Sequence, residues 1–371
     1  KKCINIIKKQ ENNSKINCDK EIIIAIPCLR EQSCIEETIK YFSKIAKNIP
    51  IIIITTKKEE KENINNDVLT REIVKNNILP KYENVYLVDY PKTEGYMADQ
   101  LNYMLENLDL ILNRKVDLSN TYLALYNADS IPNEKTFNEM KYKINQGHKI
   151  IQQYSYCMKN YENLSNILKG FSIYQSNFEL KTGIINGLLK SKLLYTHVVG
   201  HGLVINMETL KKLGNFNTKF WCEDIYLGLQ LKFNNLRIEP MLALENMETP
   251  TKLKNLIKQN SVWFKTTSQF SKMYKDIISK GNFKNKINGF IGCFNEFRCA
   301  INWLCFPMLL MLLIISSILI KDFGILIAGV ISYFLYIGIN TIMTMKLINI
   351  LDKTNYKVSL KMILNVAMIW N

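Results

Sequence analysis

The stretch Glu21-Ile-Ile-Ile-Ala-Ile-Pro27 is a continuous apolar run that ends at a proline, and apolar residues recur at helical spacing from 36 to 46. This pattern predicts a strand that leads into a helix. Similar patterns predict strands at 49–54, 85–88 and 122–126 and helices near 67–77 and 97–108. Strands that are apolar on both faces and joined by helical crossovers form a mostly parallel sheet with helices on both faces. The sequence therefore predicts an α/β fold.

Polar residues and turns follow each of these predicted strands, at Pro27, Thr55-Thr56, 89–95 and 127–130. In sheets of this kind, ligands bind beyond the carboxyl ends of the strands. We therefore expect these segments to line one cleft.

Acidic residues stand at two separate places in the chain. Asp129 follows the strand predicted at 122–126, and Glu223-Asp224 lies far downstream. Together with the apolar C-terminal region, this order suggests a metal-dependent transferase that works at a bilayer surface. The alternative for 127–132 is an Asx-type turn that closes a strand. The alternative for Glu223-Asp224 is a capping pair, which the start of a helix favours.

The C-terminal part carries two uncharged apolar runs, 300–320 and 323–345, each long enough to cross a hydrocarbon core of about 30 Å as a helix. Only Lys321-Asp322 joins them, whereas lysines and arginines flank the pair, so the positive-inside rule places the large domain in the cytoplasm. Residues 283–299 predict an interfacial amphipathic helix, with an ordinary core helix as the alternative. Two buried helices of a soluble protein are the alternative to the membrane hairpin.

Composition limits the domain organisation. The chain has 371 residues, 47% of them hydrophobic, and a formal net charge of +15. We expect a polar leader at 1–20, a cytosolic catalytic domain at 21–282, and a membrane region at 300–371 with two spans and the start of a third. The opening Lys1-Lys2 without Met and the end at Asn371 suggest a fragment.

The basic charge suits an anionic membrane or phosphate-bearing substrates. Nucleic acid is not an expected partner, because the lysines are dispersed among acidic residues. Nine scattered cysteines without a C-x-x-C pair indicate reduced thiols.

Six short motifs follow one another along the chain: Ile26-Pro27-Cys-Leu-Arg30-Glu31, Thr93-Glu-Gly95-Tyr-Met-Ala-Asp99-Gln100-Leu-Asn102, Asn127-Ala-Asp129-Ser, Gly200-His201-Gly202, Glu223-Asp224 and Gln259-Asn-Ser-Val-Trp263. They occur in the order seen in membrane-associated family 2 glycosyltransferases, and the chain most resembles the cellulose-synthase-like and hyaluronan- or chitin-synthase-like branch. The resemblance covers roughly 21–270 and implies a nucleotide-sugar-binding fold of the GT-A type followed by transmembrane helices.

The resemblance assigns metal binding to Asp129, at the last position of the family's D-x-D motif. There a carboxylate holds magnesium or manganese against the diphosphate of the nucleotide-sugar, for which a UDP-linked donor is expected. The first acidic position of that motif is Asn127 here. An amide oxygen brings no charge, so the metal contact rests on Asp129 or has lower affinity.

Asp224 matches the family's general base, which takes the proton of the acceptor hydroxyl as that oxygen attacks the anomeric carbon with inversion. Glu223 beside it would orient the acceptor or raise the pKa of Asp224. Gln259 and Trp263 match the acceptor-binding Q-x-x-R-W motif, whose arginine is Val262 here. Lys258 or Lys265 could supply a point charge instead. The missing arginine argues against long-chain processive synthesis more than against transfer.

Donor binding is the role that the resemblance implies for most of the remaining motif residues. Thr55 stands where many relatives have an aspartate that grips the nucleotide. Asp99 and Gln100 either line the cleft or cap a helix, and His201 either contacts the donor or is structural. The donor-binding set is Pro27, Arg30, Glu31, Thr55, Gly95, Asp99, Gln100, Asn127, Asp129, Gly200, His201 and Gly202.

These observations predict an inverting glycosyltransferase that moves a hexose or N-acetylhexosamine from a nucleotide-sugar to a membrane-associated glycan or a lipid-linked acceptor. We expect it in the cell membrane as a multi-pass protein, with partner membrane proteins of a glycan-assembly or export complex. The alternative is a non-catalytic scaffold or regulator of such a complex. Its support is the lack of charge at Thr55-Thr56, Asn127 and Val262.

Overall fold

The computed structural model of the chain describes residues 3, 6, 7, 18–63, 67–189, 197–281 and 284–369, except for the side chains of 303, 304 and 306–311. The predicted leader at 1–20 lies almost wholly outside these residues, as do Phe283 and Asn371.

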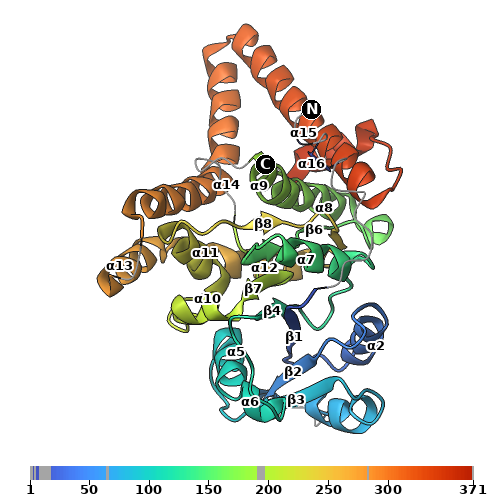
Figure 1. Cartoon of the computed structure of the whole chain (residues 1–371). Helices are drawn as coiled ribbons and strands as arrows, with labels where there is room; N and C mark the ends of the chain where they lie inside the picture. The colour runs from blue at the N-terminus through green and yellow to red at the C-terminus, as the bar shows by residue number, and fades with distance from the viewer. Residues whose placement is uncertain are drawn as a thin grey trace.

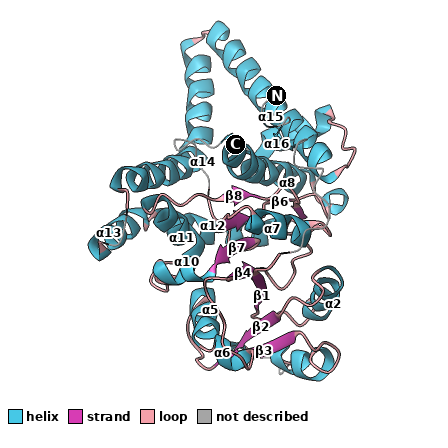
Figure 2. Cartoon of the chain, in the orientation of Figure 1, coloured by secondary structure: helices cyan, strands magenta, loops and turns pink. Residues whose placement is uncertain are grey.

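A seven-stranded sheet forms the centre of the molecule (Figure 2), in the order β3-β2-β1-β4-β7-β5-β8. All neighbouring strands are parallel except β7, which runs antiparallel to both β4 and β5. The four predicted strands are confirmed as β1 to β4, so the mostly parallel α/β sheet is confirmed too. The strands are β1 (Glu21–Pro27), β2 (Ile51–Thr56), β3 (Val85–Tyr90), β4 (Thr121–Leu125), β5 (Ile150–Gln152), β7 (Leu203–Asn206) and β8 (Glu239–Pro240).

Helices cover both faces of this sheet (Figure 1). In β1, Ile22 and Ile24 pack with α2 (Ile35–Ile45) and α7 (Thr136–Asn145), whereas Ile23 packs on the other side with α5 (Met97–Glu106) and α11 (Glu223–Phe233). Alternate residues of a strand point to opposite faces, so β1 is apolar throughout because both of its faces are buried.

Shorter elements complete the sheet domain. The helix predicted near 67–77 is α4 followed by a π-helical turn, and a small second sheet pairs β6 with β9. The elements are α3 (Lys58–Glu62), α4 (Thr70–Ile73), η1 (Val74–Ile78), α6 (Leu108–Ile111), β6 (Ser155–Tyr156), η2 (Tyr161–Asn163), α8 (Asn166–Glu179), η3 (Leu180–Ile185), α9 (Asn186–Leu189), α10 (Met207–Lys212), β9 (Glu245–Asn246), α12 (Leu253–Thr267) and α13 (Phe270–Lys280).

The C-terminal region begins with a helical hairpin of α14 (Lys286–Ile320) and α15 (Phe323–Asp352) that projects from the body in Figure 1. Lys321 takes a positive φ of 60° at the turn, and the Asp322 side chain accepts a hydrogen bond from the backbone N–H of Ile325. Within the described residues, α15 is the helix that is long and apolar enough to cross a membrane.

The predicted interfacial segment and the first predicted span form a single helix, because α14 runs for 35 residues from Lys286 through residue 300 to Ile320. Its first half packs on α11, where a Cβ on Gly289 would run into the ring of Phe233 and a Cβ on Gly292 would lie 3.1 Å from the side chain of Lys232. This half therefore joins the domain built on the central sheet to the hairpin.

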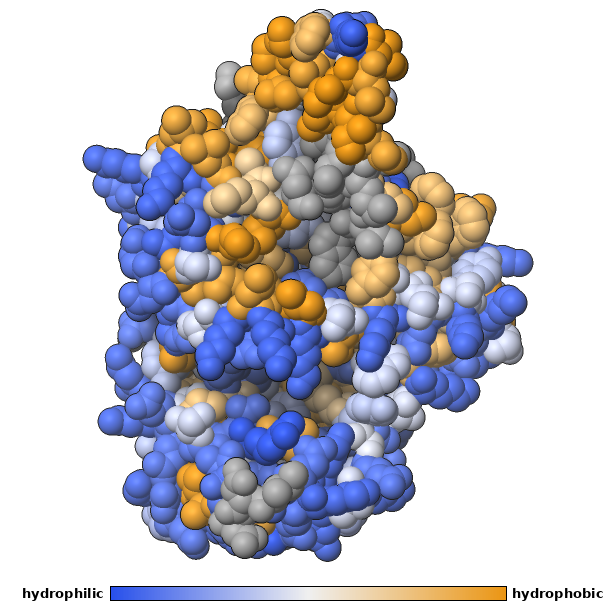
Figure 3. Space-filling view, turned by 180° about the vertical axis from the view of Figure 1, so that it is seen from behind, coloured by the Kyte–Doolittle hydropathy of each residue, from blue (hydrophilic) through white to orange (hydrophobic). Residues whose placement is uncertain are grey.

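The other side of the same half carries a stripe of exposed apolar side chains at helical spacing. Figure 3 shows hydrophobic surface gathered over the projecting hairpin as well. Five residues, 41–72% exposed, form the stripe: Ile287, Phe290, Phe294, Phe297 and Ile301.

The far end of α15 returns to the body, and α16 (Leu360–Ile369) packs on α8. A Cβ on Gly170 of α8 would strike the backbone carbonyl of Asn365, so only glycine permits this close approach. Asn177 of α8 donates to the hydroxyl of Thr344 at 2.7 Å, and Asp352 accepts hydrogen bonds from Tyr156 and Asn133. The hairpin is thus held to the body at both ends.

Candidate functional site

The carboxyl ends of β1 to β4 meet at one edge of the sheet, as parallel pairing requires. Pro27 of β1 pairs with Ile54 of β2, and Thr55 pairs with Asp89 of β3. Residues that follow these strands are therefore gathered at this edge, where the cleft was predicted.

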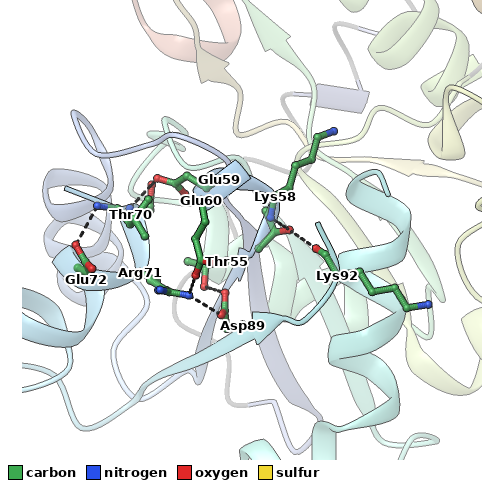
Figure 4. A network of polar contacts seen from close by, with 11 residues as sticks. Thr55, Lys58, Glu59, Glu60, Thr70, Arg71, Glu72, Asp89 and Lys92 are labelled. Carbon is green, nitrogen blue, oxygen red and sulfur yellow. Dashed lines mark hydrogen bonds and ion pairs between the residues drawn. The ribbon is translucent and has the colours of Figure 1, made fainter. Parts of the chain in front are cut away.

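Thr55 and Asp89 form the centre of a polar network at the ends of β2 and β3 (Figure 4). The Thr55 hydroxyl donates to the Asp89 carboxylate at 2.8 Å, and Arg71 lies 3.3 Å from the other oxygen of Asp89. Arg71 also pairs with Glu60. Asp89 on the neighbouring strand thus places a carboxylate beside Thr55.

Glu59 ties the loops around this network together. It is buried and accepts hydrogen bonds from the backbone and hydroxyl of Thr70, both at 2.8 Å, and from Gln32 at 2.9 Å. The Thr70 hydroxyl accepts in turn from the backbone N–H of Glu31 at 3.0 Å, and Arg30 lies 3.5 Å from Glu62. The predicted donor residues Arg30 and Glu31 are thereby fixed beside the end of β2.

Gly95 and Asp99 form the turn that starts α5. Gly95 has a φ of 111°, which favours glycine, and the Asp99 carboxylate accepts a hydrogen bond from the backbone N–H of Tyr96 at 2.8 Å. Asp99 thus caps the helix, the second of the two roles expected for it. Gln100 is buried on the sheet side of α5.

Asp129 is exposed just beyond the end of β4, and Asn127 is half-buried in the same turn. Burial raises the pKa of Glu31, and the charge of Asp129 raises it further. Burial also raises the pKa of Glu245. The side chain of His201 lowers this pKa, whereas the charge of Asp129 raises it further. Glu245 also accepts a hydrogen bond from the backbone N–H of Ile131 at 2.8 Å, so it lies beside the turn that carries Asp129.

Gly200-His201-Gly202 runs between the two acidic positions. The His201 ring is buried, and its Nε2 has no hydrogen-bond partner among the described residues. Gly202 has a φ of 67°, and a Cβ there would lie 2.8 Å from the Cβ and carbonyl of Gln153. Gly202 thus permits close backbone packing, whereas Gly200 is half-buried and faces the second acidic pair.

Glu223 and Asp224 open α11 and converge on Gly200. A Cβ on Gly200 would lie 3.5 Å from Asp224 Oδ2, 3.7 Å from Glu223 Oε1 and 3.5 Å from the methyl carbon of Met97. Gly200 adjoins His201 in the chain, so Glu223 and Asp224 lie beside the Gly200-His201-Gly202 segment.

Burial governs the protonation of this pair. It raises the pKa of Glu223, and the adjacent charge of Asp224 raises it further. Burial also raises the pKa of Asp224, although hydrogen bonds from the backbone of Ile225 and Gly200 and the charge of His197 oppose the rise. A carboxylate with a raised pKa is a better proton acceptor near neutral pH.

His197 is a buried residue whose charge acts on Asp224, and no motif in the sequence identifies it as a site residue. His197 Nε2 lies 3.9 Å from Glu179 Oε1 at the end of α8. Burial alone would lower the pKa of His197, but the hydrogen bond and charge of Glu179, together with the charges of Glu296 on α14 and Asp224, raise it. A protonated imidazole here would offset the negative charge of Asp224.

The protonation of Glu223 predicts how stability depends on pH. A carboxyl whose pKa is raised on folding favours the folded state below its unfolded pKa and loses that advantage as pH rises through the folded pKa. Glu223→Gln should therefore match the wild type near pH ~4 and exceed its Tm by about 2–4 °C near pH ~9. Thermal unfolding across this range checks the sign, and equal Tm values at both ends would contradict the buried, raised carboxyl.

Gln259 and Trp263 are exposed on α12. They lie seven and three residues before Thr266, so the three share one face of the helix. The Thr266 hydroxyl lies 2.8 Å from the sulfur of Cys222, the residue before Glu223. This face of α12 therefore points towards the start of α11.

Two further aromatic side chains stand at the same place and were not predicted as site residues. Tyr96 precedes α5, and Trp221 lies two residues before Glu223. Their ring centroids are 5.3 Å apart, although they come from distant parts of the chain. An aromatic residue close before an acidic pair is the only signal that the sequence offers for Trp221.

The described residues contain no group of three His, Cys, Asp or Glu side chains placed to hold a metal ion. Asp129 offers one exposed carboxylate without an ion pair in the described part of the chain. Magnesium commonly binds through one or two carboxylates while substrate phosphates and water complete its shell. The site thus fits a divalent ion that a diphosphate substrate helps to hold.

The sheet order, the helices on both faces and the acidic turn after β4 define the GT-A fold of nucleotide-sugar glycosyltransferases. A mannosyltransferase from Pyrobaculum calidifontis, PcManGT, solved in complex with GDP-Man and Mn2+, is similar with a TM-score of 0.53 and 13% identity, over 94% of this chain and 92% of that one.

A second solved structure, glucosyl-3-phosphoglycerate synthase from Mycobacterium tuberculosis in complex with Mn2+, UDP and glucosyl-3-phosphoglycerate, gives a TM-score of 0.38 at 14% identity, over 68% of this chain and 77% of that one. No protein-family model matches the sequence, and no curated protein matches it significantly.

Proposed function

We propose that the chain is an inverting glycosyltransferase that moves a hexose or N-acetylhexosamine from a nucleotide-sugar to a membrane-associated glycan or a lipid-linked acceptor. The observation that carries the proposal is that Glu223 and Asp224 meet at Gly200, next to His201, while Asp129 stands in the turn after β4 that Glu245 holds. We infer that these two places line one cleft, in which the donor phosphate and the acceptor hydroxyl meet.

Asp224 is the base in this proposal. Its carboxylate takes the proton of the acceptor hydroxyl while that oxygen bonds to the anomeric carbon and the bond from this carbon to the diphosphate breaks. A single displacement of this kind inverts the configuration. A magnesium or manganese ion held at Asp129, when bound, would neutralise charge on the departing diphosphate.

The fold shared with PcManGT supports a sugar attached to a nucleoside diphosphate, because that protein was solved with GDP-Man and Mn2+. The carboxylate of Asp89 beside Thr55 supports nucleotide binding at the end of β2. A UDP-linked donor remains a prediction from the resemblance, so GDP- and UDP-linked sugars both belong in the test.

A donor screen tests the proposal. One nucleotide-sugar should raise the Tm when manganese or magnesium is present, and the same compound should be hydrolysed or used for transfer. Binding without turnover on any acceptor would favour a scaffold, and stabilisation by no nucleotide-sugar would contradict the proposal.

Membrane attachment is part of the proposed function. The exposed apolar stripe of α14 adjoins the α14–α15 hairpin, and the opposite face of the same helix packs on α11, which carries Glu223 and Asp224. We infer that the stripe lies in the bilayer interface and that the hairpin spans the bilayer. The cleft would then be held at the cytoplasmic membrane surface.

Labelling of single introduced cysteines tests this topology. In sealed vesicles with the catalytic domain outside, a membrane-impermeant maleimide should modify Lys346→Cys but not Lys321→Cys until the vesicles are opened. Mass spectrometry of the two peptides separates these sites from the native cysteines. Equal labelling of both sites in sealed vesicles would show that the hairpin does not cross the bilayer.

A further inference from the structure

Tyr96 and Trp221 form an exposed aromatic pair at the cleft. Tyr96 is 50% exposed and Trp221 is 42% exposed, with their rings tilted by 52°. Single apolar side chains at a surface are ordinary. Two large rings that come from separate elements, contact each other and remain half-exposed offer apolar ring faces to a ligand.

The pair stands directly beside the proposed catalytic carboxylates. Met97 follows Tyr96 and approaches Gly200, and Glu223 and Asp224 follow Trp221 and approach the same glycine. The rings therefore flank the point where an acceptor hydroxyl would have to enter.

The Trp221 side of the pair is fixed by contacts from beyond α11. The backbone N–H of Trp221 donates to the side-chain oxygen of Gln269 at 3.1 Å, next to the contact between Cys222 and Thr266. A preorganised aromatic surface loses little freedom when a ligand stacks on it.

Two lysines stand over these rings. Lys58 Nζ lies 5.6 Å from the Tyr96 ring centroid, and Lys265 Nζ lies 5.2 Å from the Trp221 ring centroid. Lys58 also donates to the carbonyl of Gly95 and lies 3.9 Å from Glu62, whereas Lys265 has no ion pair in the described part of the chain. Each of the two rings thus has a cation close to it.

On the basis of the proposed transfer reaction, we propose that Tyr96 and Trp221 are the acceptor platform and that the acceptor is a sugar carrying a phosphate or pyrophosphate. The rings stack on the apolar C–H face of the sugar, and Lys265 with Lys58 pairs with its phosphate. The platform differs from the α12 residues Gln259 and Trp263, which the sequence resemblance assigns to the acceptor.

Acceptor kinetics test the proposal, with three probes: an octyl hexoside, a hexose 1-phosphate and a short-chain prenyl pyrophosphate-linked hexose. Trp221→Ala and Tyr96→Ala should each raise the KM for the phosphate-bearing acceptor about tenfold, and Trp221→Phe should restore most of the loss. Lys265→Met should raise the KM for the two phosphate-bearing probes but not for the octyl hexoside. The two phosphate probes distinguish a soluble acceptor from a lipid-linked one.

Donor hydrolysis without acceptor, measured in parallel for the four variants, separates a loss of acceptor binding from a loss of donor chemistry. Leu110→Ala, which removes an exposed apolar side chain on α6, provides the control. An acceptor KM that is unchanged in Trp221→Ala, or that rises only in Trp263→Ala, would contradict the acceptor platform. Neither result would contradict the proposed transferase activity. Absence of donor turnover in the wild type would overturn the proposed function first.

Discussion

Asp224→Asn should reduce sugar transfer by about 10²–10⁴-fold, the usual contribution of a positioned general base. The amide keeps the shape of the side chain at the start of α11 but cannot take the proton from the acceptor hydroxyl. Donor binding should survive, because the Thr55–Asp89 network and Asp129 stand at the ends of β2, β3 and β4 rather than on α11. Initial rates with saturating donor and acceptor, together with the donor-induced rise in Tm, measure the two effects separately.

Glu208→Gln is the matched control for removal of a carboxylate. Glu208 lies in the first turn of α10, where its backbone N–H donates to Leu118 before β4 begins, at the opposite edge of the sheet. This variant should keep the wild-type rate. A wild-type rate of transfer in Asp224→Asn would show that Asp224 is not the base. Loss of the donor-induced rise in Tm would show that Asp224 contributes to donor binding instead.

The central strands could be predicted because their continuous apolar sequence matches their burial on both faces of the sheet. Ile22 to Ile26 and Ile51 to Ile54 are buried on both faces, which only a covered parallel sheet provides. The antiparallel course of β7 carried no such signal. Leu203–Asn206 is four residues long, and its direction depends on how the chain returns past Gly202 to pair with β4.

The candidate site could be predicted only where its chemistry lies in a short motif. Asp129 and Glu223-Asp224 stand at the ends of elements that periodicity defines. The sequence indicated a missing carboxylate at Thr55, because it does not show that the register of β2 and β3 pairs Thr55 with Asp89. Trp221 and His197 meet their partners only through tertiary packing. Their positions in the sequence therefore do not mark them as site residues.

The boundary between interfacial and spanning segments was the least predictable feature of the C-terminal region. Hydropathy changes near residue 300, but nothing in Cys299-Ala300-Ile301 breaks a helix, so α14 continues without interruption. Its small residues Gly289 and Gly292 face α11, while Phe290, Phe294 and Phe297 are exposed. Only the packed structure shows that one helix belongs to both the sheet domain and the hairpin.

Two substitutions in one turn should move the metal dependence in opposite directions. Asp129→Asn removes the exposed carboxylate and should abolish the metal-dependent rise in Tm that the donor produces. Donor at about a hundredfold its Kd stabilises by about 2.7 kcal/mol, so the loss is readily measured. Asn127→Asp restores the first acidic position of the D-x-D motif and should lower the manganese concentration for half-maximal effect about tenfold, because added ligand charge raises affinity.

Both variants keep the geometry of the turn. The backbone N–H of Asn127 donates to the Ser130 hydroxyl at 3.2 Å, and the backbone N–H of Ser130 donates to the Asn127 carbonyl at 3.2 Å, neither of which uses the substituted side chains. Asn and Asp are equally suited to such turns. Manganese titrations of Tm and of turnover should therefore report ligand charge rather than folding. Identical titrations for the wild type and both variants would leave 127–132 as a turn that only closes β4, whereas opposite shifts would place the metal and the donor diphosphate at Asp129.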